Sequence, residues 1–202
     1  MTPFPQPLTG MAAPLLIDNI DTDTIIPSRE MKTTGRTGLA DGLFAPWRYS
    51  DVDARVENPV FALNQPAFRD APIIAGGANF GCGSSREHAV WALAEWGIRA
   101  VIAAGFAPIF HGNCIRNGIL PVTLPAAFVE ALAGQQVTID LQGQTVSWNE
   151  RSEGFACDAE AKQMLAQGLD ATDLTLLQDD AIAEWTAQDR DARPWVYLGD
   201  EA

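Results

Sequence analysis

The segment at residues 79–88, which reads Asn-Phe-Gly-Cys-Gly-Ser-Ser-Arg-Glu-His, gathers residue types that bind anions. An apolar run precedes it and a helical pattern follows, so we expect Ser84 and Ser85 in the first turn of a helix. Backbone N–H groups there lack intrahelical partners and carry the positive end of the helix dipole, which attracts a carboxylate or phosphate. The two glycines would let the backbone approach such a ligand, and Arg86 could bind a carboxylate through two parallel hydrogen bonds. The sequence therefore predicts an anion-binding turn.

Three other interpretations of the same turn stay open. Ser84 could simply cap the helix, with Glu87 completing a capping box. The Gly-x-Gly pair could begin a dinucleotide fingerprint, although Arg86 fills the position of its third glycine and would obstruct close helix–strand packing. Cys82 beside His88 could be a nucleophile, because a helix N-terminus favours the thiolate, but no third orienting group is evident.

Two aspartates and two histidines are further candidates for chemistry. Asp21 and Asp23 lie two residues apart in a polar stretch, where they could bind a cation, orient a catalytic hydroxyl or only stabilise turns. The chain has only His88 and His111, so a histidine-rich metal centre cannot be built from it, and each histidine could be a structural hydrogen-bonding group. We therefore expect no metal to be bound by this chain.

Regular elements alternate around the turn. Apolar runs predict strands and a 3.6-residue periodicity predicts helices, with Gly97 and Gly118 as stop signals. Strands that alternate with helices imply a parallel core with right-handed crossovers. Asn113, Arg116 and Asn117 fall towards the end of the second helix, where we expect a solvated polar face. In chain order we predict a strand at 72–75, a glycine-rich turn at 76–83, a helix at 84–96, a strand at 100–104, a helix at 108–117 and a strand at 120–124.

The rest of the chain is less regular. We expect residues 1–14 to be a frayed, proline-rich lead-in and residues 33–72 to be a long irregular excursion, which is usually functional or disordered. Residues 137–141 and 145–148 flank a Gln-Gly-Gln turn and predict a β-hairpin. Helices are expected at 126–133, 158–167 and 179–187. We interpret residues 1–202 as one α/β domain with a parallel core and a β-hairpin elaboration.

Charge and cysteine content limit the partners. The net charge of −13 opposes binding to a nucleic-acid backbone or an anionic membrane surface, and most of the acid excess lies after residue 117. No apolar run approaches the roughly 20 residues that a membrane helix needs. The three cysteines are odd in number and include no Cys-x-x-Cys pair, which argues against a disulfide framework and against a zinc or iron–sulfur site within the chain. A reducing, cytoplasmic setting is expected.

Residues 18–27, 79–88 and 105–121 together resemble the small subunits of 3-isopropylmalate dehydratase, or isopropylmalate isomerase, in the aconitase superfamily. The motifs that carry the resemblance are Asp-Thr-Asp-Thr-Ile-Ile-Pro, Asn-Phe-Gly-Cys-Gly-Ser-Ser-Arg-Glu-His and Gly-Ile-Leu-Pro, and the similarity covers nearly the whole chain. It implies the swivelling β/β/α fold of the aconitase C-terminal domain. It also implies a heterodimer with a large subunit that binds a [4Fe–4S] cluster, which accounts for the missing cluster cysteines.

The resemblance implies a hydro-lyase that interconverts 2-isopropylmalate and 3-isopropylmalate through isopropylmaleate in leucine biosynthesis. The chain would be active only with the large subunit, on a small dicarboxylate. Ser84 would be the base that exchanges the proton on carbon, Ser85 would donate to a substrate carboxylate, and Arg86 would clamp that carboxylate. Thr22 and Asp23 match the active-site loop of the family and would support the serine and the substrate. A serine hydroxyl is too weak a base unless preorganised donors hold its oxyanion, which a helix N-terminus supplies.

Substrate selectivity is expected in the loop at residues 33–47. Aconitase places a second substrate arginine in this domain, and Arg29, Lys32 and Arg36 are candidates for it. Arg36 is preferred, because it lies in the loop where family members recognise the substrate side chain. A related hydro-lyase for citraconate, dimethylmalate or homoaconitate is one alternative. A non-catalytic carboxylate-binding module is another, from a different functional class.

Overall fold

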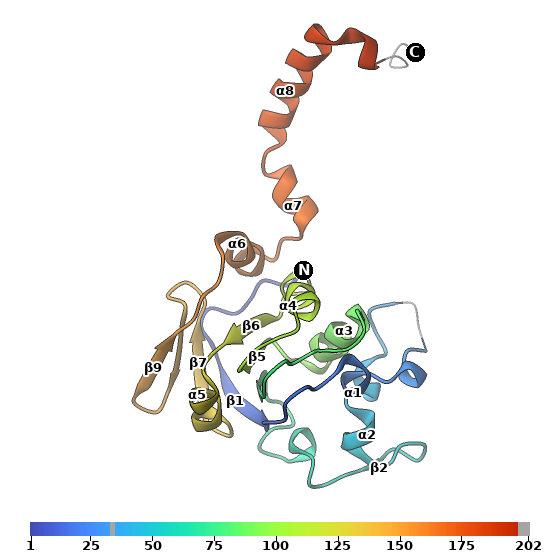
Figure 1. The fold of residues 1–202 in the computed structure, drawn as a ribbon, viewed down its shortest axis with the longest axis vertical. Coiled ribbons are helices and arrows are strands. Elements are labelled where there is room, and N and C mark those ends of the chain that lie inside the picture. The colour runs from blue at the N-terminus through green and yellow to red at the C-terminus, as the bar shows by residue number, and fades with distance from the viewer. Residues whose placement is uncertain (33–34, 198–202) are drawn as a thin grey trace.

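Within the described residues, 1–32 and 35–197, the computed structural model places seven strands in one mixed sheet (Figure 1). The strand order is β6-β5-β4-β1-β7-β8-β9. The four strands from β6 to β1 are parallel, whereas β7, β8 and β9 continue the sheet antiparallel. The expected α/β class with a parallel core and a β-hairpin elaboration is confirmed, although β9 was not predicted. The strands are β1 (Leu8–Leu15), β4 (Ile73–Gly76), β5 (Ala100–Ala103), β6 (Leu120–Thr123), β7 (Gln136–Asp140), β8 (Thr145–Trp148) and β9 (Arg151–Gly154).

The parallel strands are buried on both faces, which is why their sequences are continuous apolar runs. Successive side chains of a strand point to opposite faces. Ile74 and Val101 accordingly belong to one buried cluster, and Ile73 and Ile102 belong to the other. The sheet therefore separates two hydrophobic cores.

Helices complete both cores (Figure 1). Side chains of α3 and α4 enter the first cluster, and those of α5 and α6 enter the second. α3 ends at Gly97, which has the left-handed conformation predicted for a helix stop signal. The helices are α3 (Glu87–Trp96), α4 (Pro108–Arg116), α5 (Ala126–Leu132), α6 (Ala159–Gln167), α7 (Ala171–Leu176) and α8 (Asp179–Ala192).

The expectation of a frayed lead-in at residues 1–14 is wrong, because Leu8–Leu15 forms β1 in the middle of the sheet. Gly10 lets this strand pass close to Pro72, whose Cγ would lie 2.4 Å from a β-carbon at position 10. The N-terminal ammonium group donates a hydrogen bond to the carbonyl oxygen of Gly168 at 2.7 Å. Gly10 is therefore required by the close packing of β1 against Pro72.

The excursion at 33–72 contains only short elements in its described part, and residues 33–34 lie outside the described residues. Its apolar side chains Leu39, Leu43 and Phe44 are nevertheless fully buried in the first core. The segment is irregular in backbone but packed as part of the domain. The short elements here and just before it are α1 (Thr22–Ile25), η1 (Ser28–Glu30), η2 (Ala40–Gly42), α2 (Ala45–Arg48), β2 (Tyr49–Asp51), β3 (Val56–Glu57) and η3 (Ala62–Asn64).

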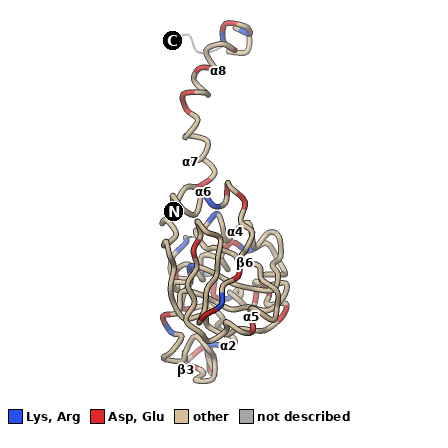
Figure 2. The backbone as a smooth tube through the Cα atoms, turned by 90° about the vertical axis from the view of Figure 1, so that its left-hand side faces the viewer, with Lys and Arg blue, Asp and Glu red and all other residues tan. Residues whose placement is uncertain are grey.

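The C-terminal helices α7, α8 and η4 (Pro194–Tyr197) extend away from the sheet as an arm (Figure 1). None of their described residues is buried, and Asp and Glu residues recur along the arm (Figure 2). The helix predicted at 179–187 continues to Ala192, and α7 was not predicted. None of the helices described in this chain is long and apolar enough to cross a membrane.

One carboxylate ties the loop before η2 to α3. Glu95 Oε1 accepts a hydrogen bond from the backbone N–H of Gly38 at 2.6 Å, and Oε2 accepts from Leu39 at 2.6 Å and Ala40 at 2.8 Å. Burial disfavours the charged form of Glu95, but the three backbone donors outweigh it and lower the pKa of this carboxyl group. The charged form of Glu95 therefore stabilises the fold.

We predict that Glu95→Gln lowers the free energy of unfolding by about 1 to 2 kcal/mol at pH 7. This loss is small for hydrogen bonds to a charged group, because Glu95 is exposed to solvent. A carboxyl group whose pKa is depressed by folding stabilises above its unfolded pKa of about 4.3 and loses that effect as the pH falls through its folded pKa. Urea unfolding should therefore show the difference at pH 7 and its progressive loss as the pH falls below about 4. Glu130→Gln, on the exposed face of α5, is the control. A difference that persisted unchanged at low pH would contradict this explanation.

The turn after β4 packs against α4 through Gly81. A β-carbon at this position would lie 2.0 Å from Cγ of Phe110, and the residue has a φ of +76°, which side chains rarely adopt. The sequence suggested that the glycine opens the backbone to a ligand. The space that a β-carbon would take is filled by the Phe110 ring, so Gly81 sets how closely the turn approaches α4, and Gly81 also lines the cavity at this site.

We predict that Gly81→Ala destabilises the chain by about 2 to 5 kcal/mol, from overpacking in the core and from the left-handed backbone. The matched control is Gly105→Ala in the adjacent loop, where the nearest atom to an added β-carbon is the Asn79 nitrogen at 3.8 Å. Chemical denaturation of both variants measures the effect. Equal stabilities of the two variants would refute the packing role of Gly81.

Candidate active site

Three loops meet at the carboxyl ends of β1, β4 and β5, the edge where parallel sheets place their ligands. The middle loop is held between the other two by backbone hydrogen bonds. The bonds run from Gly81 N to Ile20 O (2.7 Å), Thr22 N to Cys82 O (2.9 Å), Phe80 N to Gly105 O (2.9 Å) and Ala107 N to Phe80 O (3.0 Å). Residues distant in sequence are therefore brought together with a rigid backbone.

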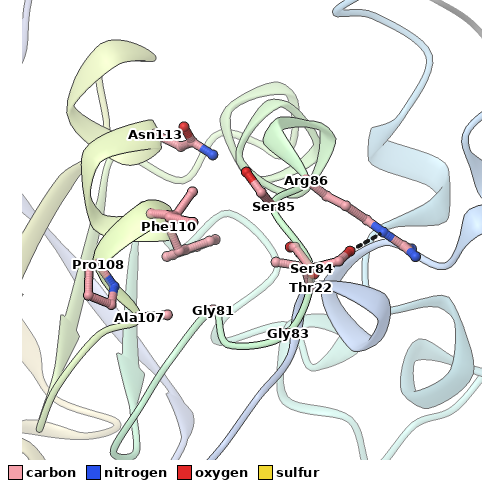
Figure 3. A pocket seen from close by; sticks show the side chains of 11 residues that line it. Thr22, Gly81, Gly83, Ser84, Ser85, Arg86, Ala107, Pro108, Phe110 and Asn113 are labelled. Carbon is pink, nitrogen blue, oxygen red and sulfur yellow. Dashed lines mark hydrogen bonds between the residues drawn. The ribbon is translucent and has the colours of Figure 1, made fainter.

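A cavity of about 190 Å³ opens between these loops and the first turns of α4 (Figure 3). One wall is polar and comes from the loops, and the facing wall is mainly apolar and comes from α4. The pocket can therefore accept a ligand with both anionic and apolar groups. Its lining consists of Thr22, Gly81, Gly83, Ser84, Ser85, Arg86, Ala107, Pro108, Ile109, Phe110 and Asn113.

Ser84 and Arg86 in the polar wall form a connected group with Asp23, which lies outside the lining. Arg86 Nε donates a hydrogen bond to Ser84 Oγ at 2.8 Å, and Arg86 Nη1 forms a close ion pair with Asp23 Oδ1. The buried Thr22 hydroxyl donates to the Ser84 carbonyl oxygen at 2.8 Å. Asp23 therefore orients the arginine, and Thr22 holds the backbone of the serine.

The helix that follows begins later than predicted. α3 starts at Glu87, with Arg86 as its N-cap in an extended conformation, so Ser84 and Ser85 lie in the turn before the helix. Among the described residues, no side chain caps α3, and Glu87 Oε1 accepts a hydrogen bond from Asn117 Nδ2 at 2.7 Å. The capping-box interpretation is therefore wrong. The Arg86 side chain, and not the helix end, contacts the hydroxyl of Ser84.

The other two predicted site residues, Ser85 and Arg36, lie in different places relative to the cavity. Ser85 lines the cavity and is exposed to solvent. Arg36 does not belong to the lining, and its guanidinium lies 5.4 Å from the ring centroid of Trp91 on α3. In this position Arg36 does not reach the wall of the cavity. A contact between Arg36 and the substrate therefore stays a prediction.

The other candidate groups have structural partners. Asp21 caps α1 by accepting from Thr24 N at 2.6 Å, and the thiol of Cys82 points to the carbonyl oxygen of Asn19. His88 packs against Trp91, and burial lowers the pKa of His111. Among residues 1–32 and 35–197, no three His, Cys, Asp or Glu side chains are grouped as they would be around a metal ion.

The expected solvated polar face of α4 holds for Arg116, which is exposed, but is wrong for Asn113 and Asn117. Asn113 is only 4% exposed and lines the cavity. Asn117 joins α4 to α3, since its Oδ1 accepts from Trp91 Nε1 at 3.0 Å and its Nδ2 donates to Glu87. Asn113 and Asn117 lie four residues apart, so they share one helix face, and that spacing was the only signal in the sequence.

Comparison with known proteins places this geometry in a family. Residues 3–127 match the aconitase C-terminal domain family. The 3-isopropylmalate dehydratase small subunit of Cupriavidus necator is 54% identical over 198 residues, which cover 94% of this chain and 95% of that one. The corresponding small subunit of Rhodospirillum centenum is 48% identical over 197 residues, which cover 94% of this chain and 96% of that one.

A solved structure agrees with the sequence relatives. The crystal structure of 3-isopropylmalate dehydratase from Methanocaldococcus jannaschii matches with a TM-score of 0.68 and 28% identity, over 89% of this chain and 99% of that chain. These matches confirm the resemblance that the motifs indicated. The chain belongs to the aconitase C-terminal domain family, in the group that contains these 3-isopropylmalate dehydratase small subunits.

Proposed function

We propose that this chain is the small subunit of a hydro-lyase that interconverts 2-isopropylmalate and 3-isopropylmalate through isopropylmaleate, in the synthesis of leucine. The observation that carries the proposal is the hydrogen bond from Arg86 to Ser84 in a cavity with one polar and one apolar wall. The relatives with 54% and 48% identity are small subunits of this enzyme, which supports the same reaction here.

The cavity matches the chemistry of the substrate. Isopropylmalate has two carboxylates, a hydroxyl and a branched alkyl group. The serines and Arg86 offer donors to oxygen atoms, whereas Ile109 and Phe110 offer an apolar surface to the alkyl group. The reaction needs each of these groups in a defined orientation at the carbon that loses its proton.

Ser84 is the proposed base. In the first step Ser84 Oγ takes a proton from one carbon while the hydroxyl leaves the adjacent carbon as water, which gives the double bond of isopropylmaleate. In the second step water adds back with the opposite placement: the hydroxyl joins the carbon that lost the proton, and a proton from Ser84 joins the carbon that lost the hydroxyl. A guanidinium carries donors only, so the bond from Arg86 Nε must be accepted by the serine oxygen. The adjacent positive charge favours the oxyanion of Ser84 over the neutral hydroxyl, which raises the fraction of the serine in the form that can accept a proton.

Arg86 also serves as the proposed carboxylate clamp. Its Nε and Nη1 atoms bind Ser84 and Asp23, which leaves Nη2 for a substrate oxygen among the described contacts. Asp23 is the proposed orienting residue for this guanidinium. Ser85, exposed at the cavity, is proposed to donate a further hydrogen bond to the same carboxylate.

The chain does not fit an iron–sulfur cluster as its own cofactor. Its cysteines are free and separate: Cys114 is fully buried, Cys82 contacts the Asn19 carbonyl, and Cys157 bonds through its backbone oxygen to Gln144. We therefore assign the [4Fe–4S] cluster to a large partner subunit. Ser84 and Ser85 are exposed, so the polar wall is accessible to such a partner. A cytoplasmic setting belongs to the same proposal.

We predict that Ser84→Ala lowers kcat about 10²- to 10⁴-fold in the complex with the large subunit, because the proton-transfer group is removed. Isopropylmaleate absorbance measures turnover, and size-exclusion chromatography verifies that the variant still assembles. Ser152→Ala, an exposed serine on β9, is the control. Full activity of an assembled Ser84→Ala complex would instead support a non-catalytic carboxylate-binding module.

We also predict that the isolated chain is folded but inactive, because part of the catalytic machinery lies on the partner. Circular dichroism checks the fold, and isopropylmaleate absorbance is followed with and without the large subunit. Turnover by the chain alone would disprove the shared site. Much faster turnover of citraconate or another substituted malate by the complex would retain the hydro-lyase and change its substrate.

A further inference from the structure

Asn113 is a buried polar residue that the proposed proton transfer does not use. It lies one turn after Ile109 and Phe110 on α4, in the otherwise apolar wall of the cavity. Its side chain faces Ser85 across the cavity, with the amide nitrogen towards the open space (Figure 3). The residue is 4% exposed, so its polar atoms have little access to bulk water.

Arg116 determines which way the amide of Asn113 points. Its guanidinium contacts Asn113 Oδ1 in a close hydrogen bond. Because a guanidinium has donors and no acceptor, the carbonyl oxygen of the amide must face Arg116. The NH₂ group is therefore turned to the opposite side, and the usual ambiguity between the oxygen and nitrogen of an asparagine is removed.

The NH₂ group of Asn113 lacks an acceptor in the protein. None of the hydrogen bonds found among residues 1–32 and 35–197 uses Asn113 Nδ2 as donor. The lining residues Ala107, Pro108 and Phe110 have no side-chain acceptor to offer, and among the described residues no hydrogen bond joins Asn113 to the Ser85 hydroxyl that it faces (Figure 3). The residue is buried as a whole, but its amide nitrogen is not among the fully enclosed unpartnered atoms of the described residues, so it stays accessible from the cavity that Asn113 lines. The vacant donor therefore indicates where a ligand oxygen belongs.

We propose that Asn113 Nδ2 donates a hydrogen bond to a substrate carboxylate, and that Arg116 is the positioning residue that holds the amide in this orientation. This rests on the proposed function. A carboxylate accepts hydrogen bonds only, so it complements a group with only N–H left to offer. Arg86 in the loop wall and Asn113 in the helix wall would then each hold one of the two carboxylates, with the reacting carbons between them.

The test is Asn113→Asp in the complete complex with the large subunit. The change keeps the size of the side chain and keeps an oxygen for Arg116, but it replaces the donor towards the cavity by a carboxylate oxygen. Binding of the substrate predicts that kcat/KM for 3-isopropylmalate falls about 100-fold or more, mainly through KM. A purely structural role predicts unchanged kinetics, because the contact with Arg116 is preserved or strengthened.

Two further variants keep the test decisive. Asn113→Leu removes the donor without adding charge, so KM should rise about 10-fold, which is less than with Asn113→Asp. If the Asn113→Asp variant does not assemble, the KM of the Asn113→Leu complex serves as the test. Asn149→Asp makes the same chemical change in the exposed turn before β9 and should leave KM unchanged. Wild-type KM in assembled Asn113→Leu and Asn113→Asp complexes would overturn the proposal.

Calorimetric titration with maleate separates this inference from the proposed function. A wild-type complex that binds maleate but does not turn over isopropylmalate, and whose Asn113→Asp variant binds maleate at least 10-fold more weakly, would refute the proposed reaction and support the carboxylate site. An active complex in which the variant binds maleate equally well would refute the carboxylate site alone. A wild-type complex without activity or maleate binding would refute both.

Discussion

The backbone hydrogen bonds that hold residues 80–82 between the loops of β1 and β5 are the constraint on which the site depends. They determine where the turn leaves the sheet, and Gly81 lets that turn contact the ring of Phe110 on α4. The same bonds bring Thr22 next to the Ser84 carbonyl oxygen. The side chains that follow are therefore placed by a backbone framework and not by the start of a helix.

The two walls of the cavity differ in chemistry because they come from different kinds of element. Loops at the carboxyl ends of strands leave polar groups accessible, whereas the first turns of α4 contribute apolar side chains that continue the core. Asn113 is the polar exception in the apolar wall, and Arg116 behind it fixes its orientation. A ligand with separated anionic and alkyl groups is the kind that such a cavity accommodates.

Electrostatic contacts and hydrogen bonds add further links between segments that already share the first hydrophobic core. The pair of Arg86 and Asp23 joins the β4 loop to α1, and Glu95 holds the loop before η2 against α3. Asn117 joins α3 and α4 through Glu87 and Trp91. These contacts lie on the side of the sheet that carries the cavity, where irregular loops need hydrogen-bonding partners in place of regular secondary structure.

Sequence by itself determined the alternating strands and helices, the parallel core and the importance of residues 79–88, because apolar periodicity and short motifs are local properties. It could not place Leu8–Leu15 inside the sheet, since this strand is stabilised by partners more than 60 residues away. It also could not show that Gly81 accommodates Phe110, or that Asn113 is buried with its amide turned to the cavity. Only the tertiary structure decides such matters, because burial and hydrogen-bonding partners depend on segments that are distant in the chain.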